Sequence, residues 1–288
     1  MRVVVIGATG QFGRAMVAAC RDASWEVLAL GHDAIEVADV ASVGRALALP
    51  YDVVVNATVW HGPAQEDPVM ALRVNALGAR VVADHAAAHG AICVTVSTDY
   101  VFDGDATCPY DETAVPAPRS VYGISKATGE ALVRAATPHH LIVRVASLFD
   151  IGGSRAKGGT SFVATMLANA RAGKPLRVVN DQIHSPSYAP DAAATTVALL
   201  RRGARGIVHV TNAGWCSWFE MAAAVFADAG IDANLTPSSL NDLPADGPPR
   251  PRYSVLAHGA LRRHGLPSPR PWREAIRDYL AREASTKP

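Results

Sequence analysis

The 288-residue sequence has few features of a metal centre, a disulfide framework or a nucleic-acid-binding surface. Its 27 Lys and Arg residues nearly balance 26 Asp and Glu residues, so charge does not predict binding to nucleic acid or to an anionic membrane. The four cysteines form no Cys-x-x-Cys pair, which argues against zinc and against disulfides: Cys20, Cys93, Cys108 and Cys216. We therefore expect a small-molecule partner, no metal site and a cytoplasmic location.

A long apolar run is also missing from the beginning of the sequence. The first such run, residues 3–6, breaks at Gly7 and is too short for a signal sequence or a membrane span. We expect no targeting segment and no membrane partner. The composition, 49% hydrophobic and 18% charged, is typical of a folded globular core, and neither an internal repeat nor a coiled-coil heptad is visible.

The first half of the chain alternates short β-branched runs with alanine-rich stretches, a rhythm that predicts a parallel sheet with helices on both faces. Runs such as 53–55, directly after Asp52, and 141–143 are continuously apolar, as strands covered on both faces require. The fold class is therefore α/β, a Rossmann-type doubly wound parallel sheet. Strands are expected at 3–6, 26–30, 53–56, 92–96 and 141–145, and helices at 14–20, 43–49, 69–89 and 125–136.

The pattern changes after Phe149, where a glycine-rich stretch at 150–159 predicts a mobile loop on the substrate side. Ser217 is suited to cap a helix over 218–229, and the proline-rich segment 237–251 predicts a loop. We expect a smaller, discontinuous C-terminal lobe, with residues 1–149 and 189–212 forming the dinucleotide-binding domain and 150–188 and 213–288 the substrate lobe. Further helices are predicted at 162–172, 191–201, 257–264 and 272–282, and strands at 176–179 and 207–210.

A glycine-rich turn follows the first predicted strand. Gly7, Gly10 and Gly13 have the G-x-x-G-x-x-G spacing, which lets backbone N–H groups approach a pyrophosphate at a helix N-terminus. The intervening Gln11 and Phe12 would line the same dinucleotide. This motif predicts nucleotide binding without specifying a reaction.

Tyr122 and Lys126 supply the chemistry that the glycine turn lacks. Four residues apart on one helix, they share a face, and a nearby ammonium is expected to lower the pKa of the phenol. Tyr122 would then donate a proton to a carbonyl oxygen as a hydride reaches the carbon, while the Thr98 hydroxyl holds that oxygen. Lys126 would also hold the nicotinamide ribose. The three residues predict a nicotinamide-dependent oxidoreductase.

These residues resemble the extended short-chain dehydrogenase/reductases, and among them the dTDP-4-dehydrorhamnose reductases. The similarity spans nearly the whole chain and includes the strand-end segment 97–104 and the C-terminal segments 179–188, 217–219, 250–256 and 271–273. It implies reduction of the C4 ketone of a nucleotide-linked 6-deoxysugar, with rhamnose as the favoured product, by NADP(H) or NAD(H). A homodimer is also implied as possible, and so is a magnesium site between subunits, for which this sequence offers no identifiable ligands.

The resemblance assigns further residues by position. It makes Thr98, Tyr122 and Lys126 the catalytic residues and adds to the cofactor site Asp39, Val40, Asn56, Ala57 and Thr58. Asp39 is equally suited to cap a helix, and Asn56 to a buried turn. It implies that the substrate contacts Thr98, Asp99, Tyr100, Gln182 and Arg250. Arg155, Lys157 and Arg252 are further candidates for the diphosphate, and Asn75 is left outside the catalytic set.

Two departures from the family pattern leave the sugar substrate open, whereas Tyr100 bears on the reaction. Ser147 stands where relatives carry a tryptophan near the sugar, and residues 60–63 replace a more polar stretch. Tyr100 occupies the position of a dehydratase's catalytic glutamate, which argues against dehydration. Another 4-keto sugar reductase, an epimerase or a non-catalytic regulatory subunit remain alternatives. For the cofactor, Asp33 would favour NAD, whereas Arg14 and His32 would favour the 2′-phosphate of NADP.

Overall fold

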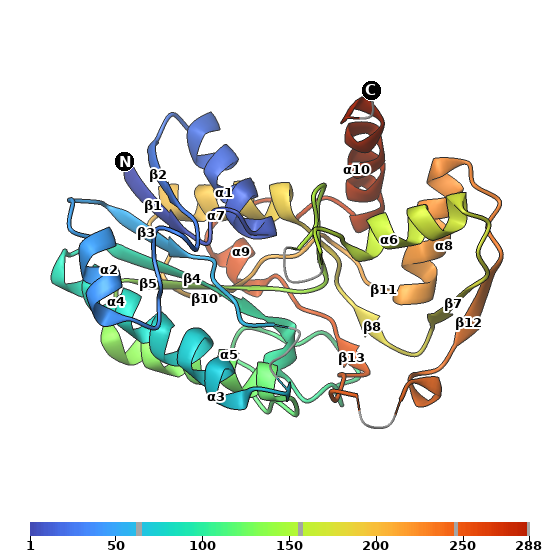
Figure 1. The fold of residues 1–288 in the computed structure, drawn as a ribbon, viewed down its shortest axis with the longest axis horizontal. Coiled ribbons are helices and arrows are strands. Elements are labelled where there is room, and N and C mark those ends of the chain that lie inside the picture. Colours follow the sequence, from blue (N-terminus) through green and yellow to red (C-terminus); the bar gives the residue numbers. More distant parts are fainter. Residues whose placement is uncertain (62–64, 155–157, 245–246, 287–288) are drawn as a thin grey trace.

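The computed structural model describes residues 1–61, 65–154, 158–244 and 247–286. Figure 1 shows two lobes, a sheet flanked by helices that contains the N-terminus and a smaller lobe that contains α6, α8 and the C-terminal helix α10. Among the described residues, no helix is long and apolar enough to cross a bilayer. In doubly wound proteins, ligands bind beside the carboxyl ends of the strands.

The larger lobe is organised by a six-stranded sheet in the order β10-β5-β4-β3-β1-β2. Every neighbouring pair in it is parallel. The apolar runs of the inner strands are buried on both faces, as expected for a parallel sheet covered by helices. The strands are β1 (Arg2–Ile6), β2 (Glu26–Leu30), β3 (Val53–Asn56), β4 (Ile92–Thr98), β5 (His140–Val145) and β10 (Gly206–His209). The predicted Rossmann-type class is confirmed.

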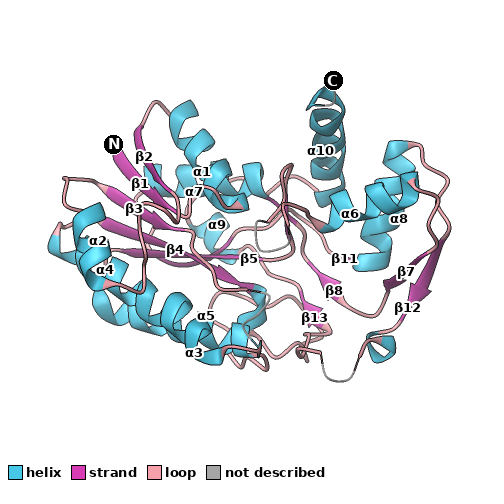
Figure 2. Ribbon diagram, viewed as in Figure 1, coloured by secondary structure: helices cyan, strands magenta, loops and turns pink. Residues whose placement is uncertain are grey.

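Helices cover both faces of this sheet (Figures 1 and 2). On one face α1 (Gln11–Asp22) packs against α7 (Ala189–Arg201), with Phe12 and Met16 in the shared core. On the other lie α2 (Val40–Ala46), α4 (Ala79–Ala88) and α5 (Val121–Ala136). Ser120 caps α5 by accepting a hydrogen bond from the Gly123 N–H at 3.1 Å. The cap begins the helix just before Tyr122.

The single helix predicted over 69–89 is wrong, because the chain makes three consecutive segments there. They are α3 (Pro68–Leu72), the π-helix η2 (Arg73–Gly78) and α4. A wider π turn moves side chains off the regular helical face, and such turns are frequent at functional sites. Here it places buried Asn75 toward α5, where a Cβ built on Gly129 would lie 2.3 Å from the Asn75 carbonyl oxygen.

The smaller lobe has its own core, which includes Phe149, Tyr188, Met221 and Ile276. Its helices are α6 (Phe162–Arg171), α8 (Trp218–Ala229) and α10 (Trp272–Thr286). Ser217 caps α8 in a capping box with Glu220, as predicted for Ser217. Its strands are β6 (Leu148–Phe149), β7 (Leu176–Val179), β8 (Ile183–His184), β9 (Ser187–Tyr188), β11 (Cys216–Ser217), β12 (Leu235–Ser238) and β13 (Tyr253–Ser254).

The predicted loop at 237–251 is wrong at its first residues, because β12 continues through Ser238 and pairs in parallel with β7. Pro237 is tolerated there because the pair has only two strands, so the missing N–H can face away from the partner. A 3₁₀ helix, η5 (Leu240–Asp242), follows. The short helix α9 (Gly259–Arg263) packs in the core of the large sheet through Ala260 and Leu261. The domain division expected from the sequence stays a prediction.

Candidate active site

The glycine turn folds tightly against itself between β1 and α1. Gly7 has φ +76°, a conformation that L residues with a side chain rarely adopt, and a Cβ on Gly13 would lie 2.1 Å from the Gly7 carbonyl oxygen. Gly10 begins α1 without a side-chain cap. The first N–H groups of the helix are therefore left for a ligand, as a pyrophosphate site requires.

Gln11 and Phe12 follow this turn but lie in different surroundings. The Gln11 side-chain amide nitrogen is buried and has no hydrogen-bond partner among the residues that the structure describes, which fits a group that a bound molecule would satisfy. Phe12 is 4% exposed and packs in the core of the large sheet. The glycine turn and the Gln11 amide thus fit a dinucleotide, whereas the Phe12 side chain stabilises the turn by packing in the core of the sheet.

The end of β3 lies directly beside the glycine turn, because a Cβ on Gly7 would be 2.9 Å from the Ala57 carbonyl oxygen. Buried Asn56 accepts hydrogen bonds from the Thr58 N–H at 3.1 Å and from the Thr58 hydroxyl at 2.6 Å. The structure therefore brings together the predicted residues Asn56, Ala57 and Thr58 with the glycines. Asn56 shapes the local turn, and its contact with a cofactor stays a prediction.

The region expected to meet the adenosine half of the cofactor is more exposed. Asp39 caps α2 by accepting a hydrogen bond from the Ala41 N–H at 2.9 Å, and Val40 is 62% exposed. The expectation that Arg14 faces a 2′-phosphate is not supported, since its guanidinium donates to the carbonyls of Thr9, Ile151 and Gly153 at 2.7–3.3 Å. Arg14 instead joins the glycine turn to the loop after β6. His32 and Asp33 are exposed at the end of β2.

Thr98, Tyr122 and Lys126 converge where the end of β4 meets the first turns of α5. Thr98 is 5% exposed, and its hydroxyl lies in hydrogen-bond contact with the phenol of Tyr122. The ring of His61 meets the Tyr122 ring edge-on with centroids 4.6 Å apart, and the Tyr100 ring lies 5.9 Å away. A Cβ on Gly123 would lie 2.2 Å from the Tyr100 carbonyl oxygen, so α5 sits directly on this segment.

The predicted lowering of the Tyr122 pKa is wrong for this structure. Burial raises the pKa of Tyr122 above that of an ordinary phenol, the Thr98 hydrogen bond opposes this, and Asp99 and Tyr100 add to the increase. Burial also lowers the pKa of Lys126 to about 8, against the opposing charge of Glu130. Desolvation exceeds the opposing effect of the Thr98 hydrogen bond, so Tyr122 stays protonated as a hydrogen-bond donor.

Three of the predicted substrate residues meet on the opposite side of Tyr122. The Tyr100 hydroxyl is hydrogen-bonded to Gln182, and the charge of Arg250 lies close enough to lower the Tyr100 pKa against its burial. Gln182 in turn accepts a hydrogen bond from the Trp218 indole N–H at 3.1 Å. Asp99 is buried beside Thr98, and burial raises the pKa of its carboxyl to about 6.

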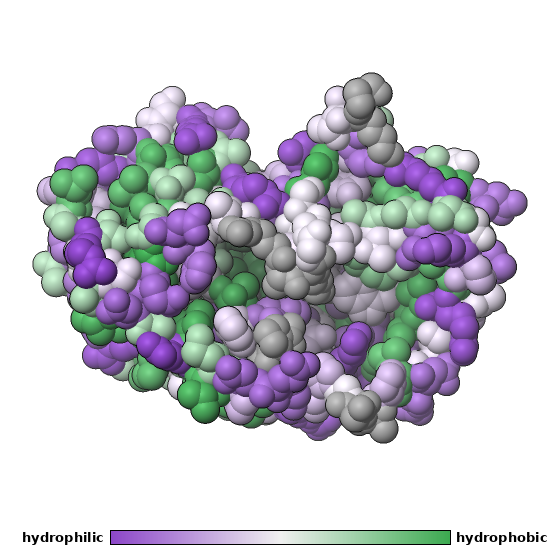
Figure 3. Space-filling view, in the orientation of Figure 1, coloured by the Kyte–Doolittle hydropathy of each residue, from purple (hydrophilic) through white to green (hydrophobic). Residues whose placement is uncertain are grey.

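The converging side chains lie at the boundary of the two lobes, and Figure 3 shows a hollow in the surface between them. Arg252 is taken up by an ion pair with Asp181 at 3.0 Å and by the Asn241 side chain at 2.9 Å, so it is less free than Arg250 to meet a diphosphate. Predictions for Arg155, Lys157, Gly62 and Pro63 lie outside the described residues. Mobility of the 150–159 loop stays a prediction.

Sequence reasoning missed several residues that build this site. Asn75 holds the chain after β3 by accepting from the Trp60 N–H at 2.8 Å and donating to the Trp60 carbonyl at 2.9 Å and to Ser125 at 2.9 Å. These bonds join the chain after β3 to α5, and the role of Asn75 in the site stays a prediction. Trp218 and Glu130 were also missed. The i,i+4 spacing from Lys126 was the signal that points to Glu130.

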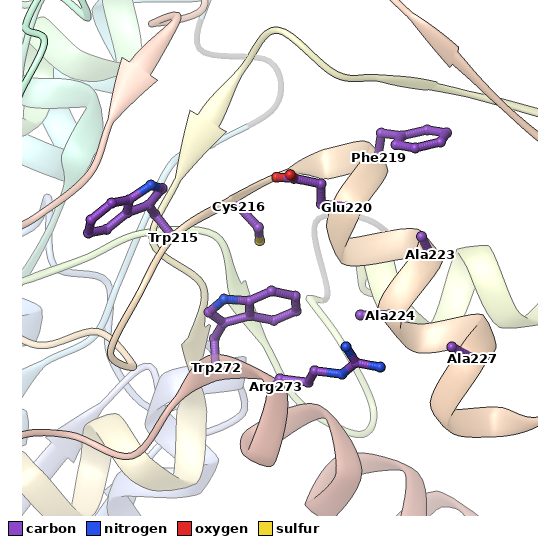
Figure 4. Close-up of a pocket in the computed structure, with 9 residues that line it drawn as sticks. All are labelled: Trp215, Cys216, Phe219, Glu220, Ala223, Ala224, Ala227, Trp272 and Arg273. Atoms are coloured by element: carbon purple, nitrogen blue, oxygen red, sulfur yellow. The ribbon is translucent and has the colours of Figure 1, made fainter.

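A second hollow, of about 410 Å³, lies between α8 and the beginning of α10 (Figure 4). Trp215 and Trp272 line it together with the outer face of α8, and Arg273 stands at its edge. None of the predicted site residues contributes to it. The candidate active site is therefore the cleft at the strand ends and not this pocket.

The sequence of the chain is similar to a family of known proteins. Residues 1–285 match the family model described as RmlD substrate binding domain. The chain belongs to the RmlD family. It is 38% identical to a probable dTDP-4,6-dihydroxy-2-methyloxan-3-one 4-ketoreductase of Streptomyces antibioticus, over 98% of this chain and 97% of the relative. It is 36% identical to a dTDP-4-dehydrorhamnose reductase of Mycobacterium tuberculosis, over 99% of this chain and 94% of the relative.

A solved RmlD-family structure agrees over nearly the same span. The dTDP-4-dehydrorhamnose reductase of Bacillus anthracis in complex with NADP superposes with a TM-score of 0.92 at 30% identity, covering 98% of this chain and 99% of that one. Family membership confirms the resemblance stated from the sequence, and with it the predicted class, a nicotinamide-dependent oxidoreductase. The individual roles of the site residues stay predictions.

Proposed function

We propose that this protein reduces the C4 ketone of a nucleotide-linked 6-deoxysugar with NADPH, and that dTDP-4-dehydrorhamnose is the first substrate to test. The observation that carries the proposal is the convergence of two hydroxyl groups, of Thr98 and Tyr122, at the edge of the sheet where the glycine turn also lies. NADPH is favoured because the similar Bacillus anthracis reductase is in complex with NADP. The relatives' printed names refer to different keto sugars, so the sugar itself needs an assay.

The bound reduced nicotinamide would supply the hydride for the carbonyl carbon. Thr98 would hold the carbonyl oxygen by a hydrogen bond, and Tyr122 would give that oxygen its phenolic proton as negative charge develops there. The raised pKa of Tyr122 suits this role, because the phenol is fully protonated until a strongly basic alkoxide forms beside it. The products are then a secondary alcohol and the oxidised cofactor.

Lys126 and the substrate side complete the arrangement. The Lys126 ammonium, buried one helical turn after Tyr122, would donate hydrogen bonds to the nicotinamide ribose. Tyr100 and Gln182 would contact the sugar, and Arg250 would pair with the diphosphate, whose oxygens an arginine binds well. Gly7, Gly10 and Gln11 would hold the cofactor pyrophosphate. A cytoplasmic location and a homodimer remain parts of this proposal without structural support of their own.

The deciding experiment is cofactor oxidation with a panel of 4-keto nucleotide sugars that includes dTDP-4-dehydrorhamnose. We expect loss of NADPH absorbance with at least one sugar, and slower loss with NADH. The panel ranks substrates and compares cofactors in a single assay. Binding of NADPH without oxidation of any sugar would contradict the proposal and favour a regulatory subunit.

A further inference from the structure

Glu130 lies on the same face of α5 as Tyr122 and Lys126, at successive i,i+4 positions. It is 3% exposed, and its carboxylate is held from two strands. One oxygen accepts from the Ser97 hydroxyl at 2.5 Å and from Arg144 Nε at 2.8 Å, and the other accepts from Arg144 Nη2 at 2.6 Å. Such bidentate bonding fixes both the charge and the position of the carboxylate.

Arg144 is itself immobilised on β5. It is 1% exposed, its guanidinium lies 5.0 Å from the Phe102 ring centre, and Nη1 lies 3.3 Å from His209 Nε2. Burial and the Arg144 charge lower the pKa of His209 to about 3, so this histidine is neutral. The cluster beneath the site therefore holds one negative charge, on Glu130, between the positive charges of Arg144 and Lys126.

Lys126 is buried at 5% exposure, and within the described parts of the chain no ion pair joins it to a carboxylate. Burial disfavours its charged form and lowers the pKa, whereas Glu130 one turn away favours the charged form. Glu130 thus acts on Lys126 through charge at a distance, while its hydrogen bonds go to Ser97 and Arg144.

The other ionisable groups near α5 are few. Tyr122 shares its face, η3 (Asp99–Val101) contributes Asp99 and Tyr100, and both tyrosines are neutral at working pH because their pKa values are raised. On the helices and strands packed against α5, the remaining ionisable groups are Arg73, Arg80, Asp84, His85, Cys93, His140 and Arg144. Of these, only Arg144 and Cys93 are buried, and burial keeps the Cys93 thiol neutral by raising its pKa.

We propose that Glu130 is a positioning residue of the reductase site, whose charge, fixed by Arg144 and Ser97, keeps Lys126 protonated and so sets the upper pH limit of cofactor binding and turnover. The inference rests on the proposed function in that Lys126 is taken to hold the nicotinamide ribose. Lys126 loses its proton as pH rises through its pKa. Removing the Glu130 charge lowers that pKa, so function is lost at a lower pH.

The test compares Glu130→Gln with Glu130→Asp. Both variants weaken the contact with Arg144, Glu130→Asp by withdrawing the carboxylate and Glu130→Gln by removing its charge, so only the second loses the charge. We expect Glu130→Gln to move the alkaline limit of NADPH affinity, measured by fluorescence titration, and of kcat downward by about one pH unit. Glu130→Asp keeps the limit near that of the wild type. Equal shifts in the two variants, or no shift in Glu130→Gln, would overturn the proposal.

Glu112→Gln is the matched control, because Glu112 is also buried but lies in another loop, where it accepts from the Ala260 N–H at 2.9 Å. It should lower stability and leave the pH limit unchanged; a shift like that of Glu130→Gln would contradict the inference. If Glu130→Gln does not fold, the double variant Glu130→Gln/Arg144→Met removes the unpaired arginine. A smaller downward shift is then expected, because loss of the Arg144 charge offsets part of the effect on Lys126. The NADPH titration needs no sugar, so a protein that binds NADPH but reduces nothing refutes the proposed function and still tests the inference.

Discussion

The two sides of the cleft are built by different means. On the cofactor side, the close approaches involve backbone: the glycine turn lies against itself and against the end of β3, with no room for a methyl group on Gly7 or Gly13. On the substrate side, the contacts run between side chains from distant segments, from Tyr100 to Gln182 to Trp218. The cofactor side depends on the absence of side chains, and the substrate side depends on their identity. Substitutions on the first side should therefore change cofactor affinity, and those on the second should change KM for the sugar.

Tyr122→Phe should have the largest effect, because Tyr122 lies between the cofactor side and the substrate side of the cleft and is the proposed proton donor. Removing the proton donor is expected to lower kcat by roughly 10²- to 10⁴-fold and to leave NADPH affinity nearly unchanged. Steady-state kinetics with NADPH titration will measure both. Tyr51→Phe is the control, since the Tyr51 hydroxyl is buried without a partner and should not matter to turnover. Full activity of Tyr122→Phe would exclude Tyr122 as the acid.

Gly13→Ala tests the cofactor side of the cleft, which is built from backbone. The new Cβ would lie 2.1 Å from the Gly7 carbonyl oxygen, so the turn must open and the pyrophosphate site with it. Overpacking of about 1–3 kcal/mol corresponds to a loss of up to roughly 100-fold in NADPH affinity, measured by fluorescence titration. In the control Gly44→Ala, on α2, the nearest atom to the new Cβ is on the His85 ring of α4 at 3.5 Å, an ordinary contact, and NADPH affinity should not change. Wild-type affinity in Gly13→Ala would show that the turn does not bind the cofactor.

Arg250→Ala tests the substrate side of the cleft, which is built from side chains. Loss of a charge-assisted hydrogen bond to the diphosphate, discounted for the exposure of Arg250, should raise KM for the nucleotide sugar about tenfold. NADPH affinity should stay constant, which separates this variant from Gly13→Ala. Arg202→Ala, which removes an exposed arginine from the end of α7, serves as the control for charge alone. A change in NADPH affinity with unchanged KM for the sugar would contradict the prediction, because it would mean that Arg250 contacts the cofactor and not the substrate.

Trp218→Phe should give the smallest effect. It keeps an aromatic ring but removes the N–H that donates to Gln182, a neutral hydrogen bond worth about 0.5–1.5 kcal/mol. We expect KM for the sugar to rise about threefold, with kcat and NADPH affinity close to wild type. Trp215→Phe, in the separate pocket, should leave all three unchanged. An equal KM change in both tryptophan variants would mean that the effect reflects the lobe as a whole.

The cofactor side of the cleft was largely predictable from sequence because its determinants are local. The buried run before Gly7, the glycine spacing and the four-residue step from Tyr122 to Lys126 each fix geometry within one strand, turn or helix. The carboxyl ends of parallel strands then bring Asn56 and Thr98 to the same edge of the sheet. Here local rules and the sheet topology agree, so the predicted residues do converge.

The substrate side of the cleft was much less predictable because its contacts join segments far apart in the chain. The two-residue strands β8, β11 and β13 are too short to show a period, and the partnership of Gln182 with Trp218 spans 36 residues. The π turn of η2 leaves no pattern that single-sequence reasoning separates from an α-helix. The balance between burial and charge at Tyr122 was also out of reach, since desolvation depends on the folded surroundings.

Two close backbone contacts of α5, both at glycines, limit how the sequence of this helix can vary. Gly123 rests on the Tyr100 carbonyl and Gly129 on the Asn75 carbonyl, with 2.2 and 2.3 Å left for any Cβ. These two points lie on either side of Lys126 and prevent the helix from sliding or rolling. In a library that randomises residues 121–136 and selects for turnover, glycine should be recovered at both positions, while outward-facing sites such as exposed Ile124 accept many amino acids.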